Sequence, residues 1–153
     1  MKKLLFIFII IFTTVITIST QIKEARLFDE FGNAECEDLR TRLDSFLVEL
    51  QNNPQSRGYV IVYDGMQYSY DSRKLQNPVF GEATLLTQQM IQHFKYRNFS
   101  PDRYLFINGG FRQNYEVELW IVPKYSKPPT LTPTVDEVKY RKGKLVGIVC
   151  GDT

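Results

Sequence analysis

Apolar side chains recur at helical spacing in two stretches of the chain. In the first they alternate with charged positions and comprise Cys36, Leu39, Leu43, Phe46, Leu47 and Leu50. Asn52-Asn53-Pro54 follows and predicts the end of this helix. The second stretch covers about 82–97 and places Ala83, Leu86, Met90 and Phe94 on one face. The pattern therefore predicts two amphipathic helices, each with one face available to a core.

Four shorter stretches have the composition of strands. Residues 26–31 alternate loosely, whereas 59–63 is β-branched and aromatic with no polar face, which is typical of a central strand covered on both sides. Residues 104–107 predict a third strand and the alternating residues 115–122 a fourth. Asn108-Gly109-Gly110 lies between them, so we expect an antiparallel pair joined by a turn that uses positive φ.

Two further stretches lack a clear periodicity. Residues 64–81 contain several turn dipeptides and predict a long loop, and loops of this length tend to be functional or mobile. Residues 127–133 are rich in proline and threonine and predict a semi-rigid, extended linker. After the linker, 135–149 is compatible with a hairpin around Lys142-Gly143.

The order of these elements predicts an α/β (α+β) fold. A strand–helix–strand–helix–strand–strand order gives a mixed sheet with both helices on one face, a βαβαββ two-layer sandwich. We expect this domain to span 24–123, with the linker at 124–134 and a C-terminal tail at 135–153.

Residues 1–20 have the features of a secretory signal peptide. The basic start Met1-Lys2-Lys3 is followed by nine apolar residues, Leu4 through Phe12, and threonines interrupt the run before it reaches membrane-spanning length. We expect export to the periplasm or the cell exterior, with cleavage after about Ser19 and no stable membrane span afterwards. The alternative is an uncleaved N-terminal anchor.

Charge and cysteine content narrow the class of protein. The chain has 19 basic and 17 acidic residues, and removal of Lys2 and Lys3 with the signal makes the two counts equal. This balance argues against nucleic acid as a partner, because phosphate binding uses a surplus of lysine and arginine. In an oxidising compartment Cys36 and Cys150 are candidates for a disulfide; two free thiols, or pairing with a partner, are the alternatives.

Few residues have the types or spacing that catalysis requires. Glu116 and Glu118 share a strand face about 7 Å apart, which is within the range of an inverting glycosidase, and Trp120 is placed to stack on a sugar. The alternative is a solvated strand face. We expect His93 at the surface, without a nucleophile or a metal-ligand cluster near it. The sequence therefore predicts a protein without enzymatic activity or cofactor.

Several short segments, taken in order, resemble one known family. They are Phe28-Asp29-Glu30-Phe31 in the first strand, Leu43-Asp44 to Asn53-Pro54 in the first helix, the central strand that reaches Asp64, and Asn98-Phe99-Ser100-Pro101-Asp102-Arg103 before the third strand. Together they resemble the C-terminal domain family of outer membrane protein A, over about Leu27 to Val122. The resemblance implies the same fold and an association with peptidoglycan.

The resemblance also implies a ligand site. In that family an aspartate after the central strand and an arginine on the next helix hold the amine and carboxylate of diaminopimelate in the wall peptide. Asp64 corresponds to the aspartate, but the helix opening, Gly81 to Thr87, has no arginine, and Arg73 in the preceding loop is the nearest substitute. Tyr68 and Tyr70 lie in the same loop, where they either line a binding surface or cover the sheet edge.

These expectations combine into one hypothesis of function. We expect an exported, non-catalytic binding or interaction module of the cell envelope, whose partner is peptidoglycan or an envelope protein. The candidate surface is the 64–80 loop together with the Gly109-Gly110 turn. The alternatives are a glycan-processing enzyme that uses Glu116 and Glu118, or a purely structural envelope protein.

Overall fold

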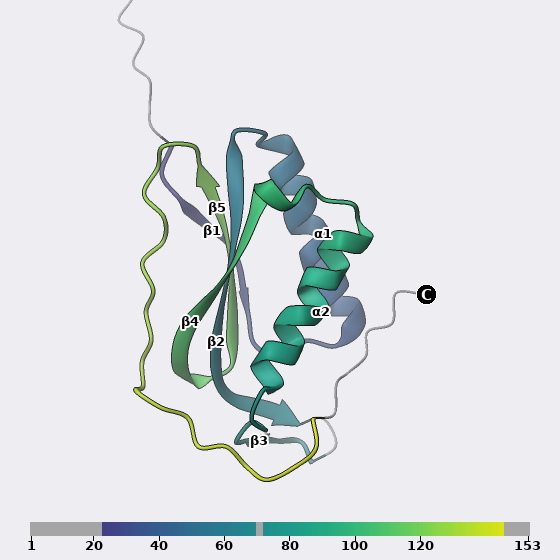
Figure 1. Ribbon diagram of the computed structural model, residues 1–153, viewed down its shortest axis with the longest axis vertical. Coiled ribbons are helices and arrows are strands. Elements are labelled where there is room, and N and C mark those ends of the chain that lie inside the picture. The colour runs from purple at the N-terminus through teal and green to yellow at the C-terminus, as the bar shows by residue number, and fades with distance from the viewer. Residues whose placement is uncertain (1–22, 70–71, 146–153) are drawn as a thin grey trace, which may run out of the picture.

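The protein consists of one β-sheet with two helices packed on one of its faces (Figure 1). The structure is a computed structural model that describes residues 23–69 and 72–145, so the expected signal peptide lies outside the described residues. The elements are β1 (Arg26–Phe31), α1 (Cys36–Asn52), β2 (Ser56–Ser69), β3 (Lys74–Gln76), α2 (Glu82–Tyr96), the 3-10 turn η1 (Pro101–Arg103), β4 (Tyr104–Asn114) and β5 (Glu116–Pro123). The predicted class, mixed α/β with a sheet and two helices, is confirmed. None of the helices in this part of the chain has the length and apolarity to cross a membrane.

The sheet is built around β2. On one side β2 pairs antiparallel with β5, which pairs antiparallel with β1; on the other side β2 pairs parallel with β4. The short β3 pairs antiparallel with the last residues of β2. The sheet is therefore mixed, as the order of elements predicted.

The core lies between the sheet and the helices. The predicted apolar positions of α1 from Leu39 to Leu50 are buried, and so are Met90 and Phe94 of α2. From the sheet, β2 contributes Val60 and Val62, and β5 contributes every second residue, Val117, Leu119 and Ile121; Tyr115, just before β5, continues this row. The rings of Phe46, Phe99, Tyr104 and Phe106 lie around Phe94 with centroids 4.9–6.4 Å from it. The helix faces predicted from spacing are thus confirmed.

The prediction of a loop over 64–81 is wrong for its first part. β2 continues to Ser69, because Asp64 and Met66 pair with β4 and Gln67 to Ser69 pair with β3. Gly65 makes this continuation feasible: a Cβ there would lie 2.3 Å from the backbone carbon of Asn114. The dipeptide Asp64-Gly65 was expected to form a turn, but it lies within β2 at a point of close contact with β4.

The predicted turn at Gly109-Gly110 is also wrong. β4 runs through both glycines to Asn114, and Tyr115 connects it to β5. The expected antiparallel pairing of these two strands with each other is wrong as well, because β4 and β5 each pair with β2. Gly109 is required by the neighbouring strand, since a Cβ would approach the ring of Tyr63 to 2.5 Å. Gly110 has φ 90° and lies where the β2–β4 register shifts, so it forms a bulge within the strand.

The chain after β5 crosses the sheet face opposite the helices and then turns beneath β3 (Figure 1). Residues 124–126 form a turn, and further along the N–H groups of Thr134 and Val135 donate to the carbonyl of Phe111. Val135 to Leu145 makes isolated bridges, to Phe111 and to Val79, and forms no hairpin within itself. The second half of the expected hairpin, 146–149, lies outside the described residues.

Candidate binding groove at Asp64

A groove of about 340 Å³ lies where β2, β4 and the beginning of α2 meet. Its apolar walls include Val62, Phe80, Phe106 and Phe111, and Thr84 and Thr87 line it from α2. Asp64 and Tyr140 are the residues with acidic groups among those that line it. A concave apolar site with few polar groups is the usual form of a small-ligand site.

Local sequence explains how Asp64 reaches this groove. Because strand side chains alternate, Asp64 shares the helix-facing side of β2 with Val62, which is part of the core. Gly81 begins α2 from a left-handed conformation, φ 87°. The carboxylate of Glu82 accepts the N–H of Val79 at 2.7 Å, which fixes the turn into the helix. The groove is thus formed by the end of the buried strand and a tight helix entry.

The Asp64 carboxylate lacks a cationic partner in the groove. It accepts hydrogen bonds from the N–H of Gly65 at 2.8 Å and from the Tyr140 hydroxyl at 2.9 Å. Burial raises the pKa of Asp64, while these two hydrogen bonds lower it; burial has the larger effect. No lysine or arginine is among the described residues that line the groove. A half-buried carboxylate in such surroundings favours binding of a cation.

Tyr140 reaches the groove from the C-terminal segment. Its ring packs edge-on against Phe80, with centroids 5.3 Å apart, and Phe80 is 76% exposed. The hydrogen bond to Asp64 and the burial of the phenol both raise the pKa of Tyr140, burial more strongly. Sequence reasoning missed Tyr140, and no motif around it marks this role.

The other predicted site residues do not join Asp64 in this groove. Arg73 is exposed in the turn before β3, with φ 53°, and does not line the groove. Tyr68 lies on β2 opposite Leu75, and its N–H donates to Asn33. Tyr70 lies outside the described residues. The substitution of Arg73 for the missing helix arginine is therefore not supported by where Arg73 lies.

The predicted disulfide falls partly within the described chain. Cys36, at the beginning of α1, is disulfide-bonded. Its expected partner, Cys150, lies outside the described residues, so the pairing stays a prediction.

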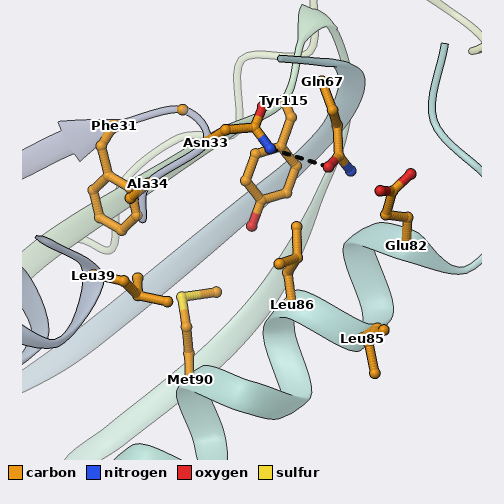
Figure 2. Close-up of a pocket in the computed structure, with 11 residues that line it drawn as sticks. Phe31, Asn33, Ala34, Leu39, Gln67, Glu82, Leu85, Leu86, Met90 and Tyr115 are labelled. Carbon is orange, nitrogen blue, oxygen red and sulfur yellow. Dashed lines mark hydrogen bonds between the residues drawn. The ribbon is translucent and has the colours of Figure 1, made fainter. Parts of the chain in front are cut away.

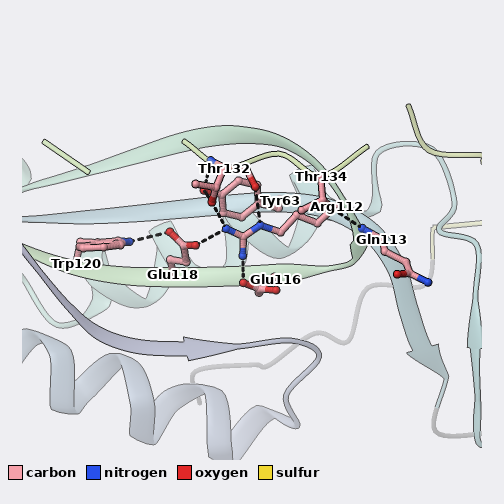
Figure 3. A network of polar contacts seen from close by, with 8 residues as sticks. All are labelled: Tyr63, Arg112, Gln113, Glu116, Glu118, Trp120, Thr132 and Thr134. Carbon is pink, nitrogen blue, oxygen red and sulfur yellow. Dashed lines mark hydrogen bonds and ion pairs between the residues drawn. The ribbon is translucent and has the colours of Figure 1, made fainter. Parts of the chain in front are cut away.

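A buried ionic network occupies the sheet face opposite the helices (Figure 3). Arg112 of β4 donates to the carboxylates of Glu116 and Glu118, and its guanidinium lies 3.7 Å from the centroid of the Tyr63 ring. It also donates to the carbonyl and the hydroxyl of Thr132. Arg112 thus joins β2, β4, β5 and the crossing segment, a role that sequence reasoning missed.

The interpretation of Glu116 and Glu118 as a solvated strand face is wrong for Glu118. Glu118 is 5% exposed, so the face is not solvated, and its second oxygen accepts the indole N–H of Trp120 at 2.8 Å. One carboxylate oxygen from each of Glu30, Glu116 and Glu118 lies within 4.8 Å of the others, and Arg112 bridges Glu116 and Glu118. Arg112 thus pairs with both carboxylates, its single positive charge offsetting one of their two negative charges, and Glu118 holds the Trp120 indole through the hydrogen bond.

The expectation of a surface histidine is wrong. His93 is 4% exposed, and its Nε2 lies 2.8 Å from the carboxylate of Asp44 on α1, which also accepts two hydrogen bonds from Arg97. Burial raises the pKa of Asp44, but the hydrogen bonds from Arg97 and His93 outweigh it and the net shift is downward. These contacts join α1 to α2 and leave His93 with a structural role.

A second, small cavity lies between the β1–α1 connection and α2 (Figure 2). Its volume is about 40 Å³, and the amide of Gln67 and the ring of Tyr115 border it. Gln67 is 7% exposed and accepts a hydrogen bond from Asn33 at 3.1 Å, whereas its Nε2 has no partner within the described chain. The cavity has room for water-sized molecules but not for a peptide or a sugar.

Comparison with known proteins leaves the Asp64 groove as the main guide to function. No family model, curated protein or solved structure matches the chain.

Proposed function

We propose that the protein is an exported, non-catalytic binding module of the cell envelope that holds a cationic group of the cell-wall peptide in the Asp64 groove. The proposal retains the similarity to the C-terminal domain family of outer membrane protein A, whose aspartate corresponds to Asp64. The mixed sheet with two helices on one face is compatible with that family's fold.

The observation that carries the proposal is the environment of Asp64. Its carboxylate is partly desolvated, lies among apolar side chains and has no basic neighbour among the residues that line the groove. An ammonium group would place a positive charge next to the carboxylate of Asp64. It would also donate hydrogen bonds in place of those that the carboxylate loses when it is removed from water. The free amine of a diaminopimelate-type residue has this chemistry, and the apolar walls suit its methylene chain.

The second half of the family's clamp is missing from this groove. α2, Glu82–Tyr96, contains no arginine, so a ligand carboxylate would meet the hydroxyl of Thr84 and not a guanidinium fork, since Thr87 donates its hydroxyl to the carbonyl of Ala83. Neutral hydroxyls bind a carboxylate more weakly than a bidentate arginine does. We therefore expect weaker binding than a complete clamp would give, with most of it dependent on Asp64.

Retention on purified cell-wall sacculi tests the proposal. The protein is expressed from its full-length sequence, purified as the cell processes it, and sedimented with sacculi. We expect the wild type to co-sediment and D64N to lose at least about tenfold in affinity, because the amide keeps the shape but not the charge. Blocking the wall amines by acetylation should have the same effect.

The matched control is D102N, which removes the charge of an exposed aspartate that does not line the groove. D102N should bind as the wild type does. Equal loss in both variants would mean that net charge, and not the groove, governs retention. Absence of wild-type retention would remove the wall peptide as the ligand.

A further inference from the structure

The C-terminal segment 136–145 lies across the groove of its own chain. Arg141 forms a parallel bridge with Val79, and its N–H donates to the carbonyl of Pro78 at 2.9 Å. One residue earlier, Tyr140 donates its hydroxyl to Asp64 and packs against Phe80. Two successive residues thus attach this segment to the groove, one through its backbone and one through its side chain.

Tyr140 occupies the position that a cationic ligand needs. Oδ1 of Asp64 accepts the N–H of Gly65, which leaves Oδ2 as the oxygen for a ligand, and Oδ2 accepts the Tyr140 hydroxyl. The phenol also lines the groove, so its ring takes space there. A ligand ammonium would therefore compete with this side chain for the carboxylate and for space beside it.

Residues 136–145 are attached more weakly than the residues around Thr132 that precede them. Thr132 is held by Arg112, which is tied to two buried or half-buried carboxylates. In contrast, Tyr140 is 39% exposed and Leu145 is 49% exposed. A few exposed hydrogen bonds open at low cost, as is usual for segments that move on binding. Residues up to Val135 can stay in place while 136–145 leaves.

We infer that residues 136–145 form a self-inhibitory plug, in which the Tyr140 hydroxyl holds Asp64 until a ligand ammonium displaces it. This inference rests on the proposed function, since the plug closes the same groove. The open form is the competent one, so the apparent dissociation constant equals the intrinsic one divided by the fraction of molecules that are open. The loss of one net hydrogen bond should shift that equilibrium about 2- to 10-fold.

Two variants and one control test the plug in the sacculus assay. Y140F removes the hydroxyl and keeps the ring, and Y140A removes both. Y125F removes the hydroxyl of a tyrosine that is 85% exposed and does not line this groove. We expect Y140F to bind about 2- to 10-fold more tightly than the wild type, Y140A at least as tightly as Y140F, and Y125F unchanged. Weaker binding of Y140F and Y140A would make Tyr140 part of the ligand site and overturn the plug.

Hydrogen exchange measures the closure without any ligand. The N–H of Arg141 is bonded to Pro78, so exchange in 136–145 should be faster in Y140F and D64N than in the wild type and in Y125F. Unchanged exchange in Y140F and D64N would overturn the plug whatever the sacculi show. If no variant is retained on sacculi but exchange accelerates as expected, the wall-peptide proposal fails while closure of the groove by Tyr140 stands. If D64N loses retention and Y140F does not gain it, the proposed function stands and the plug does not.

Discussion

Asp64 illustrates how a binding residue differs from its neighbours in the same strand. Val60 and Val62 of β2 are buried among apolar side chains, and Asp64 occupies the next position on that face, at the edge of the core. Burial raises its pKa, so the charged form is disfavoured by the fold. The partly buried carboxylate therefore lowers the stability of the folded protein, and binding of a ligand cation would recover that loss.

The first residue-scale prediction concerns the stability of D64N. Between the usual pKa of 3.8 and the raised folded pKa, the folded protein holds a proton that the unfolded chain has released. The stability of the wild type relative to D64N therefore falls as pH rises through this window. We expect thermal unfolding of D64N at a higher temperature than the wild type at pH 7, with the difference vanishing below about pH 3.8. A D64N protein that is less stable at pH 7 would show that the ionised carboxylate supports the fold.

The second residue-scale prediction concerns Arg112. R112M leaves Glu118 buried without its ion pair, which should lower the free energy of unfolding by about 3–5 kcal/mol. R112K keeps the positive charge but loses the bidentate guanidinium, so its free energy of unfolding should fall by less than that of R112M. Urea unfolding measures both, with R73M as the control for an exposed arginine. In the double variant R112M/E118Q part of the stability should return; an R112M protein as stable as R73M would contradict the role given to this network.

At the scale of elements, local pattern predicted the helices and the strand cores, but not the strand lengths. Spacing within one segment determines which face of α1 or α2 is apolar, and that spacing is legible in the sequence. The ends of β2 and β4 depend on how closely the two strands approach each other at Gly65 and Gly109. A glycine at a close strand contact and a glycine in a turn look alike in one sequence, so both were expected to be turn residues.

Gly109 gives the prediction at this scale. In G109A the added methyl group meets the Tyr63 ring at 2.5 Å and Ile61 at 2.8 Å, both of which are buried. We expect a loss of about 1–3 kcal/mol in the free energy of unfolding from overpacking. G32A, whose new methyl group would lie 3.2 Å from one carbonyl oxygen, is the milder comparison. A G109A protein as stable as the wild type would mean that β2 and β4 separate easily.

At the scale of the whole molecule, the segment after β5 contacts both faces of the sheet and so affects which residues on each face a ligand can reach. It covers Tyr63 on the face opposite the helices, through Arg112 and Thr132, and then reaches the groove on the helix side with Tyr140. The Asp64 half of the candidate site was predicted from the sequence. The Tyr140 half was not, because a contact across 76 residues leaves no local pattern.

The whole-molecule prediction concerns the cysteines. Cys36 is disulfide-bonded, and we expect Cys150 to be its partner. The mass of the intact protein should then be lower by two hydrogens than that of the reduced form, with one cross-linked peptide containing both residues after proteolysis. Reduction should lower stability by about 2–5 kcal/mol, because the bridge restricts the unfolded chain. A disulfide-linked dimer would contradict the intramolecular pairing.

The measurement that tests the central claim most directly is an NMR titration of the purified protein with a soluble wall peptide that carries a free diaminopimelate amine. The account predicts saturable shifts in the amides of Asp64, Phe80 and Thr84, absent in D64N and absent when the amine is acetylated. Shifts confined to the surface around Trp120, or none at millimolar peptide, would contradict the assignment of the Asp64 groove as the binding site.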